Sequence, residues 1–448
     1  MPDLDKKTDG CGTFSPRSQF SLFRSRKFLP LFLTMFLGAF NDNFFKSAMV
    51  ILITYRLADA SGFDARILVT AAAGIFILPF VMFSAIAGQL ADKYERSMLV
   101  RRVKLLEIAV MSGAVAGFYT ASITLLMAVL FLMGAQSTLF GPLKYSILPQ
   151  HLDTEELIGA NGLIETGTFL AILLGTIFGG LFVLGEWGIG LVSLLVVGIA
   201  AAGWAASLFV PETRVINPFL EFRFNIFTET WRLVSDVRPR RDIFLSILGI
   251  SWFYFVGGTF LSQFPTYAKI VIGADEQVAT LFLAVFSVGV GAGSLACNGL
   301  LKGEISGRYV PWAALGISAG SAALYFASLR PETPKEPLIS MTQFLSSGPN
   351  LAVLACLFGI SFFGGLYIVP LYAIIQSRSG EDRLAGVTAC CNVMDSLFMV
   401  ISSAAAAAML EAGFSIPQIF LAMAALTAAA SFVIRNAVRD QMKGRGNP

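Results

Sequence analysis

The side chains in this sequence that could do chemistry are a few charged groups set within long apolar segments. Asp42 is followed four residues later by Lys46, while Lys144, Glu165 and Asp395 each lie in a different apolar segment. A charged group inside a membrane-spanning helix costs several kcal/mol unless it is paired or faces a polar cavity. These five residues are therefore candidates for binding a charged substrate or a coupling ion.

Asp42 and Lys46 allow two interpretations. At a spacing of four residues they share one helix face, where they can neutralise each other as a structural pair. In the second interpretation, Asp42 binds the ammonium of a zwitterionic headgroup or a coupling cation, and Lys46 restrains Asp42 or meets a phosphate. Asn41 and Asn43 flank Asp42 and add polar atoms to the same turn.

Lys144 follows the pair Gly141-Pro142, which is expected to interrupt the hydrogen bonding of its helix and leave backbone groups free. Its flexible ammonium group is a suitable partner for a phosphate. The same side chain can also extend to the membrane surface as an interfacial lysine. Both interpretations stay open on the residues alone.

Two segments carry polar residues at helical spacing. The first face begins polar and ends in small residues, and the second holds a carboxylate among other polar groups. Their members are Asn161, Glu165, Thr168, Ile172, Gly175 and Gly179 in the first, and Thr388, Asn392, Asp395, Met399 and Ser402 in the second. Gly175 and Gly179 are expected to serve close helix packing. Packing does not require Glu165 or Asp395.

The composition indicates which elements must position these residues. Of 448 residues, 56% are hydrophobic and 14% are charged, against about 25% charged in soluble domains, which excludes an ordinary soluble enzyme. A membrane-spanning helix needs about 20 mostly apolar residues. We predict an all-α integral membrane protein with twelve spans, at residues 28–57, 66–91, 99–120, 122–148, 157–184, 188–210, 242–270, 277–301, 309–329, 350–377, 383–410 and 415–434.

The basic residues indicate the topology. With the N-terminus inside, the cytoplasmic segments hold 26 of the 32 Lys and Arg residues, with Lys104 counted among the loop residues, and the outer side holds five. Cytoplasmic loops carry such an excess, so both termini are expected there, the first as an uncleaved tail. The predicted organisation is a tail (1–27), a six-helix half (28–210), a basic linker (211–241), a second six-helix half (242–434) and a tail (435–448). Two such halves are typical of internally repeated transporters.

Several other functions find no support in the residues. The basic residues form no stripe for nucleic acid, and the five cysteines include no Cys-x-x-Cys pair. The single histidine, His151, is expected in a solvated loop. The glycine-rich stretch 289–293 lies in an apolar segment without a preceding strand, so it does not indicate a nucleotide-binding loop. We expect no cofactor, no metal and no nucleic-acid partner.

The connection between the second and third predicted spans carries a motif, GQLADKYER at 88–96. It resembles the loop signature of the major facilitator superfamily. In that signature a glycine is followed by any three residues, an aspartate, a basic residue, any two residues and a second basic residue. The matching residues are Gly88, Asp92, Lys93 and Arg96, and Asp92 is expected to face a helix N-terminus or a basic partner across the two halves. Glu95 departs from the signature, which usually has glycine there.

Four further blocks narrow the resemblance: AFNDNFFK (39–46), GPLKYSILP (141–149), ANGLIE (160–165) and GGLYIVPL (364–371). Together they are similar to the bacterial lysophospholipid transporter family over residues 28–434. The resemblance implies a carrier that moves lysophospholipids such as lysophosphatidylethanolamine from the outer to the cytoplasmic leaflet of the inner membrane. There, a cytoplasmic acyltransferase partner would reacylate them.

The resemblance also implies site residues. The expected substrate-binding residues are Asn41, Asp42, Lys46, Lys144, Asn161, Glu165, Asn392 and Asp395. Glu165 and Asp395 are further expected to belong to gates that open sideways to lipid. Residues 259–262 lack a basic residue that some family members carry, so phosphate recognition would rest more on Lys144.

Two alternative functions remain. The same helices and charges would serve a polyspecific efflux or small-solute carrier. A non-transporting membrane scaffold could instead recruit an acyltransferase through the basic linker. The charges at Asp42, Lys46 and Asp395 favour a carrier, because a scaffold does not need them.

Overall fold

Twelve long helices make up most of the chain in the computed structural model, which describes residues 18–57, 65–329 and 338–444, without the side chains of 66 and 433–444. These helices are α1 (Leu29–Leu52), α3 (Ala65–Lys93), α4 (Arg96–Tyr119), α5 (Ile123–His151), α6 (Leu157–Val183), α7 (Gly188–Ser207), α9 (Arg241–Thr266), α10 (Glu276–Leu301), α11 (Val310–Ser328), α13 (Gly348–Arg378), α14 (Leu384–Glu411) and α15 (Ile416–Gly444). The predicted all-α, twelve-helix fold class is confirmed.

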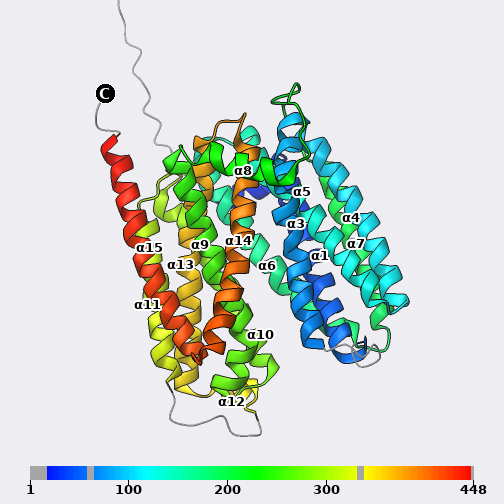
Figure 1. Ribbon diagram of the computed structural model, residues 1–448, viewed down its shortest axis with the longest axis vertical. Helices are drawn as coiled ribbons and strands as arrows, with labels where there is room; N and C mark the ends of the chain where they lie inside the picture. The colour runs from blue at the N-terminus through cyan, green and yellow to red at the C-terminus, as the bar shows by residue number, and fades with distance from the viewer. Residues whose placement is uncertain (1–17, 58–64, 330–337, 445–448) are drawn as a thin grey trace, which may run out of the picture.

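Ten of these helices are both long and apolar enough to cross a membrane by length and composition. The helix α4 falls short because Arg101, Arg102, Lys104 and Glu107 lie in its first half. In α15 the side chains are described only as far as Phe432, so the apolar stretch that can be assessed there is Ile416–Phe432. Both helices nevertheless pack alongside the other ten in the same bundle (Figure 1).

Shorter elements lie at the helix ends. They are the 3-10 helices η1 (Gln19–Arg24) and η3 (Thr154–Glu156), the π-helical turns η2 (Ile53–Leu57) and η4 (Tyr267–Ile272), and the α-helices α8 (Ile226–Val237) and α12 (Met341–Leu345). The sequence did not predict α8, which forms part of the basic linker. The end of the bundle at which α8 lies is called the linker end below.

The long helices form two groups that lean against each other (Figure 1). One group contains α1 and α3 to α7, and the other contains α9 to α11 and α13 to α15. Across the boundary, α3 packs on α14 and α6 packs on α10. Contacts of α5 with α14 and of α6 with α13 complete the boundary between the groups.

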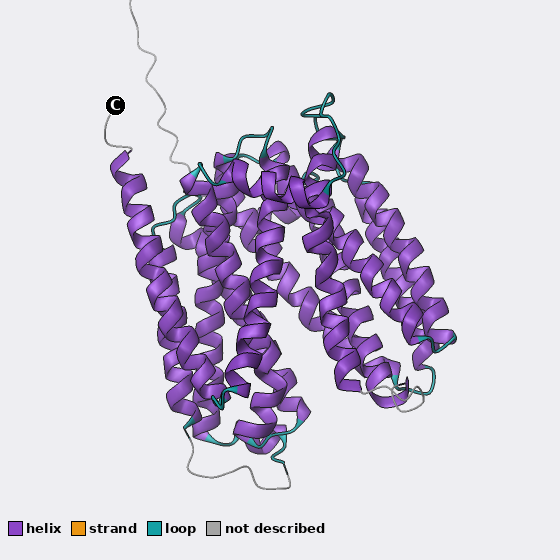
Figure 2. Ribbon diagram, viewed as in Figure 1, coloured by secondary structure: helices purple, strands orange, loops and turns teal. Residues whose placement is uncertain are grey.

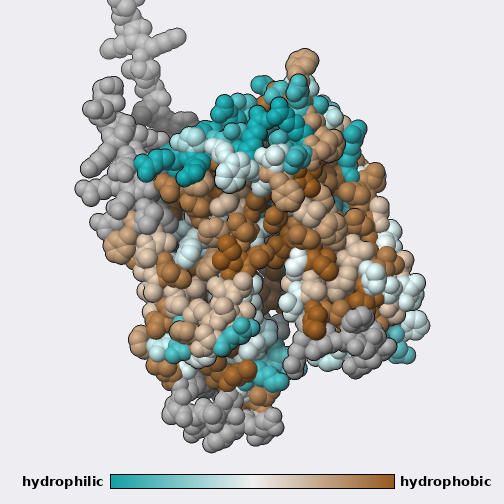
Figure 3. All heavy atoms as spheres, in the orientation of Figure 1, coloured by the Kyte–Doolittle hydropathy of each residue, from teal (hydrophilic) through white to brown (hydrophobic). Residues whose placement is uncertain are grey.

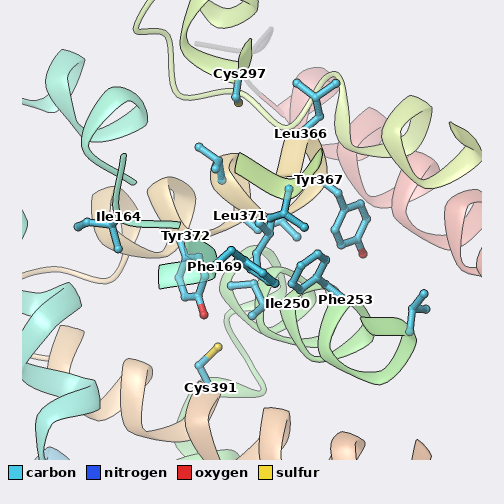
Figure 4. Close-up of a cluster of buried hydrophobic side chains, with 14 of the residues drawn as sticks. Ile164, Phe169, Ile250, Phe253, Cys297, Leu366, Tyr367, Leu371, Tyr372 and Cys391 are labelled. Atoms are coloured by element: carbon cyan, nitrogen blue, oxygen red, sulfur yellow. The ribbon is translucent and has the colours of Figure 1, made fainter. Parts of the chain in front are cut away.

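Close contacts join the groups at the linker end. A Cβ placed on Gly88 of α3 would lie 2.8 Å from Cβ of Ala389 in α14, so a larger residue there would push the helices apart. Buried side chains from both groups also meet in one apolar cluster, in which Phe169 of α6 lies edge-on to Phe253 of α9, with ring centroids 6.2 Å apart (Figure 4).

Within each group, small residues allow helices to approach closely. A Cβ on Gly175 would lie 2.5 Å from the backbone oxygen of Phe40, and one on Gly179 would meet the backbone of Phe44. Both glycines thus pack α6 against α1, as their spacing indicated.

At the end opposite α8, the two groups diverge (Figure 2). The molecular surface is hollowed between them on this side (Figure 3). Polar side chains gather at the linker end, whereas apolar side chains cover the flanks of the bundle, as expected of a membrane protein.

Candidate functional site

A cavity of about 260 Å³ lies between the two helix groups. It is lined by residues from both groups, so its shape depends on how they sit against each other. Its polar and charged lining residues are Asp42, Lys104, Gln136, Ser137, Lys144, Tyr145, Thr168, Tyr254, Tyr372, Asn392, Asp395 and Ser396. Apolar side chains, among them Phe76, Phe80 and Met399, complete the wall near the seam between α3 and α14.

Asp42 reaches the cavity from α1. The Ser137 hydroxyl donates a hydrogen bond to its Oδ2 at 2.6 Å, while its buried Oδ1 has no hydrogen-bond partner among the described residues. Lys46 does not form an ion pair with Asp42 within 4.0 Å in the described structure; its Nζ lies 5.3 Å from the centre of the Phe76 ring. Asp42 therefore keeps one buried carboxylate oxygen without a hydrogen-bond partner among the described residues.

A second charged pair in the same group was missed by the sequence analysis. Lys104 and Glu107 are buried in α4 with Nζ and Oε2 2.7 Å apart, so the assignment of Lys104 to a cytoplasmic loop is wrong. Asn41 donates to Glu107 Oε1 at 3.0 Å and Gln136 donates to Oε2 at 3.3 Å. Asn41 thus binds Glu107 behind the cavity wall, while Lys104 lines the cavity.

Lys104 was missed because the predicted third span begins at residue 99 and the basic residues at its start were all attributed to the loop. Its partner Glu107 lies one turn further into the span. A charged pair at a spacing of three residues within an apolar segment is a recognisable signal. The structure gives the reason for its burial, since both carboxylate oxygens of Glu107 accept hydrogen bonds.

Lys144 lines the cavity from α5, with Nζ 4.5 Å from the centre of the Tyr145 ring. The helix α5 continues from Ile123 to His151 through Pro142 and Pro149, so the helix does not end at Gly141-Pro142, although Pro142 has no N–H to donate to the preceding turn. Neighbouring groups in a membrane protein can satisfy the backbone freed by a proline. Gly141 instead allows Asn392 of α14 to lie directly against α5.

Three tyrosines connect the two groups at the cavity. The Tyr145 hydroxyl donates to Glu165 Oε1 at 2.7 Å, and the Tyr145 ring stacks on Tyr372 with centroids 4.3 Å apart. The hydroxyl oxygens of Tyr372 and Tyr254 lie 3.4 Å apart. Glu165 itself is buried behind Tyr145 and is not part of the lining. Sequence spacing gave no signal for this cluster, because its members lie on α5, α9 and α13.

On the other side of the cavity, α14 presents Asn392 and Asp395. The Ser251 hydroxyl donates to Asp395 Oδ1 at 2.7 Å, and Cys391 Sγ lies 3.5 Å from Oδ2. Asn392 Nδ2 has no hydrogen-bond partner among the described residues. The lining on this side therefore holds a carboxylate and a buried amide donor that packs against Gly141 of α5.

Asn161 takes a different position from the other candidate residues. It is fully buried in α6 and is not part of the cavity lining. Its Nδ2 donates to Gln376 Oε1 of α13 at 2.6 Å, and Gln376 Nε2 donates back to Asn161 Oδ1 at 3.1 Å. This reciprocal amide pair joins the two groups.

The loop motif closes the linker end. The Asp92 carboxylate lies against Gly386 in the first turn of α14 and 3.5 Å from Arg96 Nη2. A carboxylate at a helix N-terminus is favourable because the backbone N–H groups there lack partners. Arg96 also donates to the backbone oxygens of Ser146 at 2.9 Å and Glu381 at 3.2 Å.

The remaining motif residues lie nearer to solvent. Lys93 Nζ is 6.0 Å from the centre of the Tyr94 ring. Glu95, which departs from the signature, caps α4 by accepting from the backbone N–H groups of Ser97 and Met98 at 3.0 and 2.7 Å. Partial burial opposes ionisation of Glu95, but hydrogen bonds from Ser97, Thr213 and Met98 outweigh it and hold the pKa of Glu95 below its usual value.

The family model of the Major Facilitator Superfamily matches residues 12–332, most of the chain. The chain therefore belongs to this superfamily, as the motif at Gly88 indicated. It is 28% identical over 374 residues to the lysophospholipid transporter LplT of Cronobacter sakazakii. The aligned region covers 82% of this chain and 84% of that relative. The LplT protein of Serratia proteamaculans is 27% identical over 376 residues, and the aligned region covers 81% of this chain and 83% of that protein.

Solved structures share the fold at low sequence identity. The Escherichia coli fucose:proton symporter FucP superposes with a TM-score of 0.66 at 15% identity, covering 94% of this chain and 99% of that one. The human organic anion transporter MFSD10 superposes with a TM-score of 0.69 at 15% identity, covering 91% of this chain and 98% of that one. A bacterial homologue of the iron transporter ferroportin, in an outward-facing state, superposes with a TM-score of 0.64 at 14% identity, covering 90% of this chain and 98% of that one.

Proposed function

We propose that this protein carries lysophospholipids across the bacterial inner membrane, from the outer to the cytoplasmic leaflet. The observation that carries this proposal is the cavity between the two helix groups, which presents separated carboxylate and ammonium groups to one space. A zwitterionic headgroup needs both kinds of partner. The similarity to proteins named lysophospholipid transporters supports the same substrate class.

The headgroup would bind by charge. Lys144 and Lys104 suit the phosphate, because a lysine ammonium is a compact partner for phosphate oxygens. Asp42 suits the amine, since its Oδ1 has no partner among the described residues. Asp395 and the amide of Asn392 complete the lining on the opposite wall.

The acyl chain would remain outside this cavity. A volume of about 260 Å³ lies below the range of roughly 300–1,000 Å³ typical of pockets for drug-sized ligands, so the cavity suits a headgroup. The apolar residues Phe76, Phe80 and Met399 line it beside the seam between α3 and α14. We propose that gates at the seams, near Asp395 on α14 and Glu165 on α6, open sideways so that the tail stays in the bilayer.

The orientation follows from the charges. The linker end carries the loop motif, α8 and most basic residues, so we place it and both termini in the cytoplasm. The contacts of Gly88, Asp92, Arg96 and Asn161 close that end, and the groups diverge at the other (Figure 2). In this arrangement the cavity faces outward, where the substrate would enter, and an acyltransferase would use the product inside.

A substrate panel tests this function. Purified protein in liposomes would be given lysophosphatidylethanolamine with a labelled headgroup, and separately soluble glycerophosphoethanolamine and small hydrophilic dyes. We expect leaflet transfer of the lysolipid that is competed by other single-chain phospholipids and not by the dyes. Exchange of a soluble compound without transfer of any lysolipid would show that the protein is a solute carrier of the same fold.

A further inference from the structure

The helix α8 in the linker has an apolar arc that the rest of the protein covers only in part. At 100° per residue, Leu233, Val237, Val234, Phe227 and Trp231 fall in one continuous arc of the helix, and Arg232 and Asp236 fall outside it. Val237 is 4% exposed, whereas Phe227 is 87% and Trp231 is 74% exposed. Two large aromatic side chains, one helical turn apart, are therefore left uncovered on their outer side by the part of the chain that the structure describes.

The covered part of the arc faces both helix groups. Cδ2 of Leu233 lies 3.5 Å from where a Cβ on Gly386 of α14 would stand. In the helix group that contains α3, Gln89 accepts a hydrogen bond from the backbone N–H of Arg223, just before α8, at 2.9 Å. The Gln89 amide also donates to Glu229 of α8 at 3.5 Å. The helix α8 thus lies across the seam between α3 and α14 at its linker end (Figure 1).

This position fixes the depth of α8. The helix packs where α3 ends at Lys93 and α14 begins at Leu384. If these helices span the bilayer, their ends lie at the level of the membrane surface. Aromatic side chains are enriched at that level because their rings are apolar and their edges tolerate water. The side chains of Arg223 and Arg232 are more than half exposed nearby and form loose, exposed ion pairs with Glu221 at 3.9 Å and Asp236 at 3.8 Å. Exposed ion pairs of this kind contribute little, so both cations can also meet lipid phosphates.

We propose that α8 is an interfacial helix whose Phe227 and Trp231 face inserts among the headgroups and upper acyl chains of the leaflet at the linker end. Helices of this kind lie in the membrane plane with an apolar face in the lipid and basic residues at the headgroups. Because α8 contacts both α3 and α14, the leaflet thereby holds a helix that bridges the contact between the two groups. This inference does not depend on the substrate of the carrier.

Tryptophan fluorescence of the full-length protein in liposomes tests the proposal. The chain has five tryptophans, so variants with Trp231 or Trp312 as the sole tryptophan would be made by Trp→Phe substitution elsewhere. Trp312, 68% exposed in the first turn of α11, is the matched positive control, because α11 also begins at the linker end. Lipids brominated near the top of the acyl chain quench only tryptophans that contact them.

We expect Trp231 to emit at shorter wavelength in liposomes than after denaturation, to be quenched by the brominated lipids like Trp312, and to lose most of its quenching by aqueous acrylamide. In the sole-Trp231 background, Phe227→Gln should reduce the lipid quenching while the protein keeps its gel-filtration profile. Full acrylamide quenching with no effect of brominated lipid would overturn the proposal. The proposal would also be overturned if protection of Trp231 from acrylamide rose with protein concentration and did not respond to brominated lipid. That result would assign the Phe227 and Trp231 face to a second copy of the protein or to a protein partner.

Discussion

Breaking the buried pair of Lys104 and Glu107 is the perturbation whose size the structure defines best. Both side chains are 2% exposed and the charged atoms are 2.7 Å apart, a distance at which the attraction is about 6 kcal/mol at an effective dielectric constant of 20. Lys104→Met removes one partner and leaves Glu107 buried without its cation. We expect a loss of about 3–5 kcal/mol in the free energy of unfolding.

The double variant Lys104→Met, Glu107→Gln separates charge from packing. The neutral amide that replaces the Glu107 carboxylate keeps an oxygen that can accept from Asn41 or Gln136, so we expect most of the loss to be recovered, to within about 1–2 kcal/mol of the wild type. Arg308→Met is the matched control, because its pair with Glu304 spans 3.7 Å and both side chains are about half exposed; it should cost only about 0–1 kcal/mol.

Unfolding would be followed by far-ultraviolet circular dichroism in mixed micelles as the fraction of denaturing detergent rises. We expect strong coupling between the two positions, so that the double variant is more stable than the two single substitutions together would give. It would be refuted if Lys104→Met cost no more than the exposed control, or if the double variant were as unstable as the sum of the two single variants. Either result would show that the pair is not desolvated in the folded protein.

Three further predictions follow from other contacts. Asn161→Ala leaves Gln376 without its buried partner, at a cost of about 1–3 kcal/mol, so cysteines placed at the linker end should become more reactive to a soluble thiol reagent. Gly175→Val places side-chain atoms against the backbone of Phe40, and melting should show a loss of about 1–3 kcal/mol. Glu95→Ala removes the cap of α4, worth about 1 kcal/mol near pH 7. Because the pKa of Glu95 is lowered by folding, its stabilisation is present above the unfolded pKa and is lost as the pH falls through the folded pKa, so the difference in melting temperature between wild type and variant should shrink in acid.

The sequence predicted the number and order of the spanning helices because apolar length is a local property. Even α4, whose apolar stretch Lys104 and Glu107 interrupt, overlaps the span predicted from 99 to 120. The helix α8 was missed because its 12 residues are too few for a span and its apolar residues read as part of a basic linker. The helix α5 continues through Pro142, because a proline removes one backbone donor while the surrounding helices decide whether the helix ends there.

The site could be predicted from the sequence only where a single charged residue stands out within an apolar segment. Asp42, Lys144 and Asp395 stand out as charges in apolar segments, and all three line the cavity. Tyr145 and Tyr372 are 227 positions apart, and no local pattern indicates that their rings stack. For the same reason the pairing of Asn161 with Gln376 could not be read from helical spacing.

In the proposed function, Asp42 and Lys144 hold the headgroup of a lysophospholipid during its passage through the cavity. The most direct test is leaflet transfer of headgroup-labelled lysophosphatidylethanolamine in liposomes by wild type, Asp42→Asn and Lys144→Ala, each folded and equally abundant, beside Glu186→Gln and Lys27→Ala at exposed positions. The account predicts that transfer is lost in the two cavity variants and kept in the two controls. Transfer at the wild-type rate in both cavity variants would contradict it.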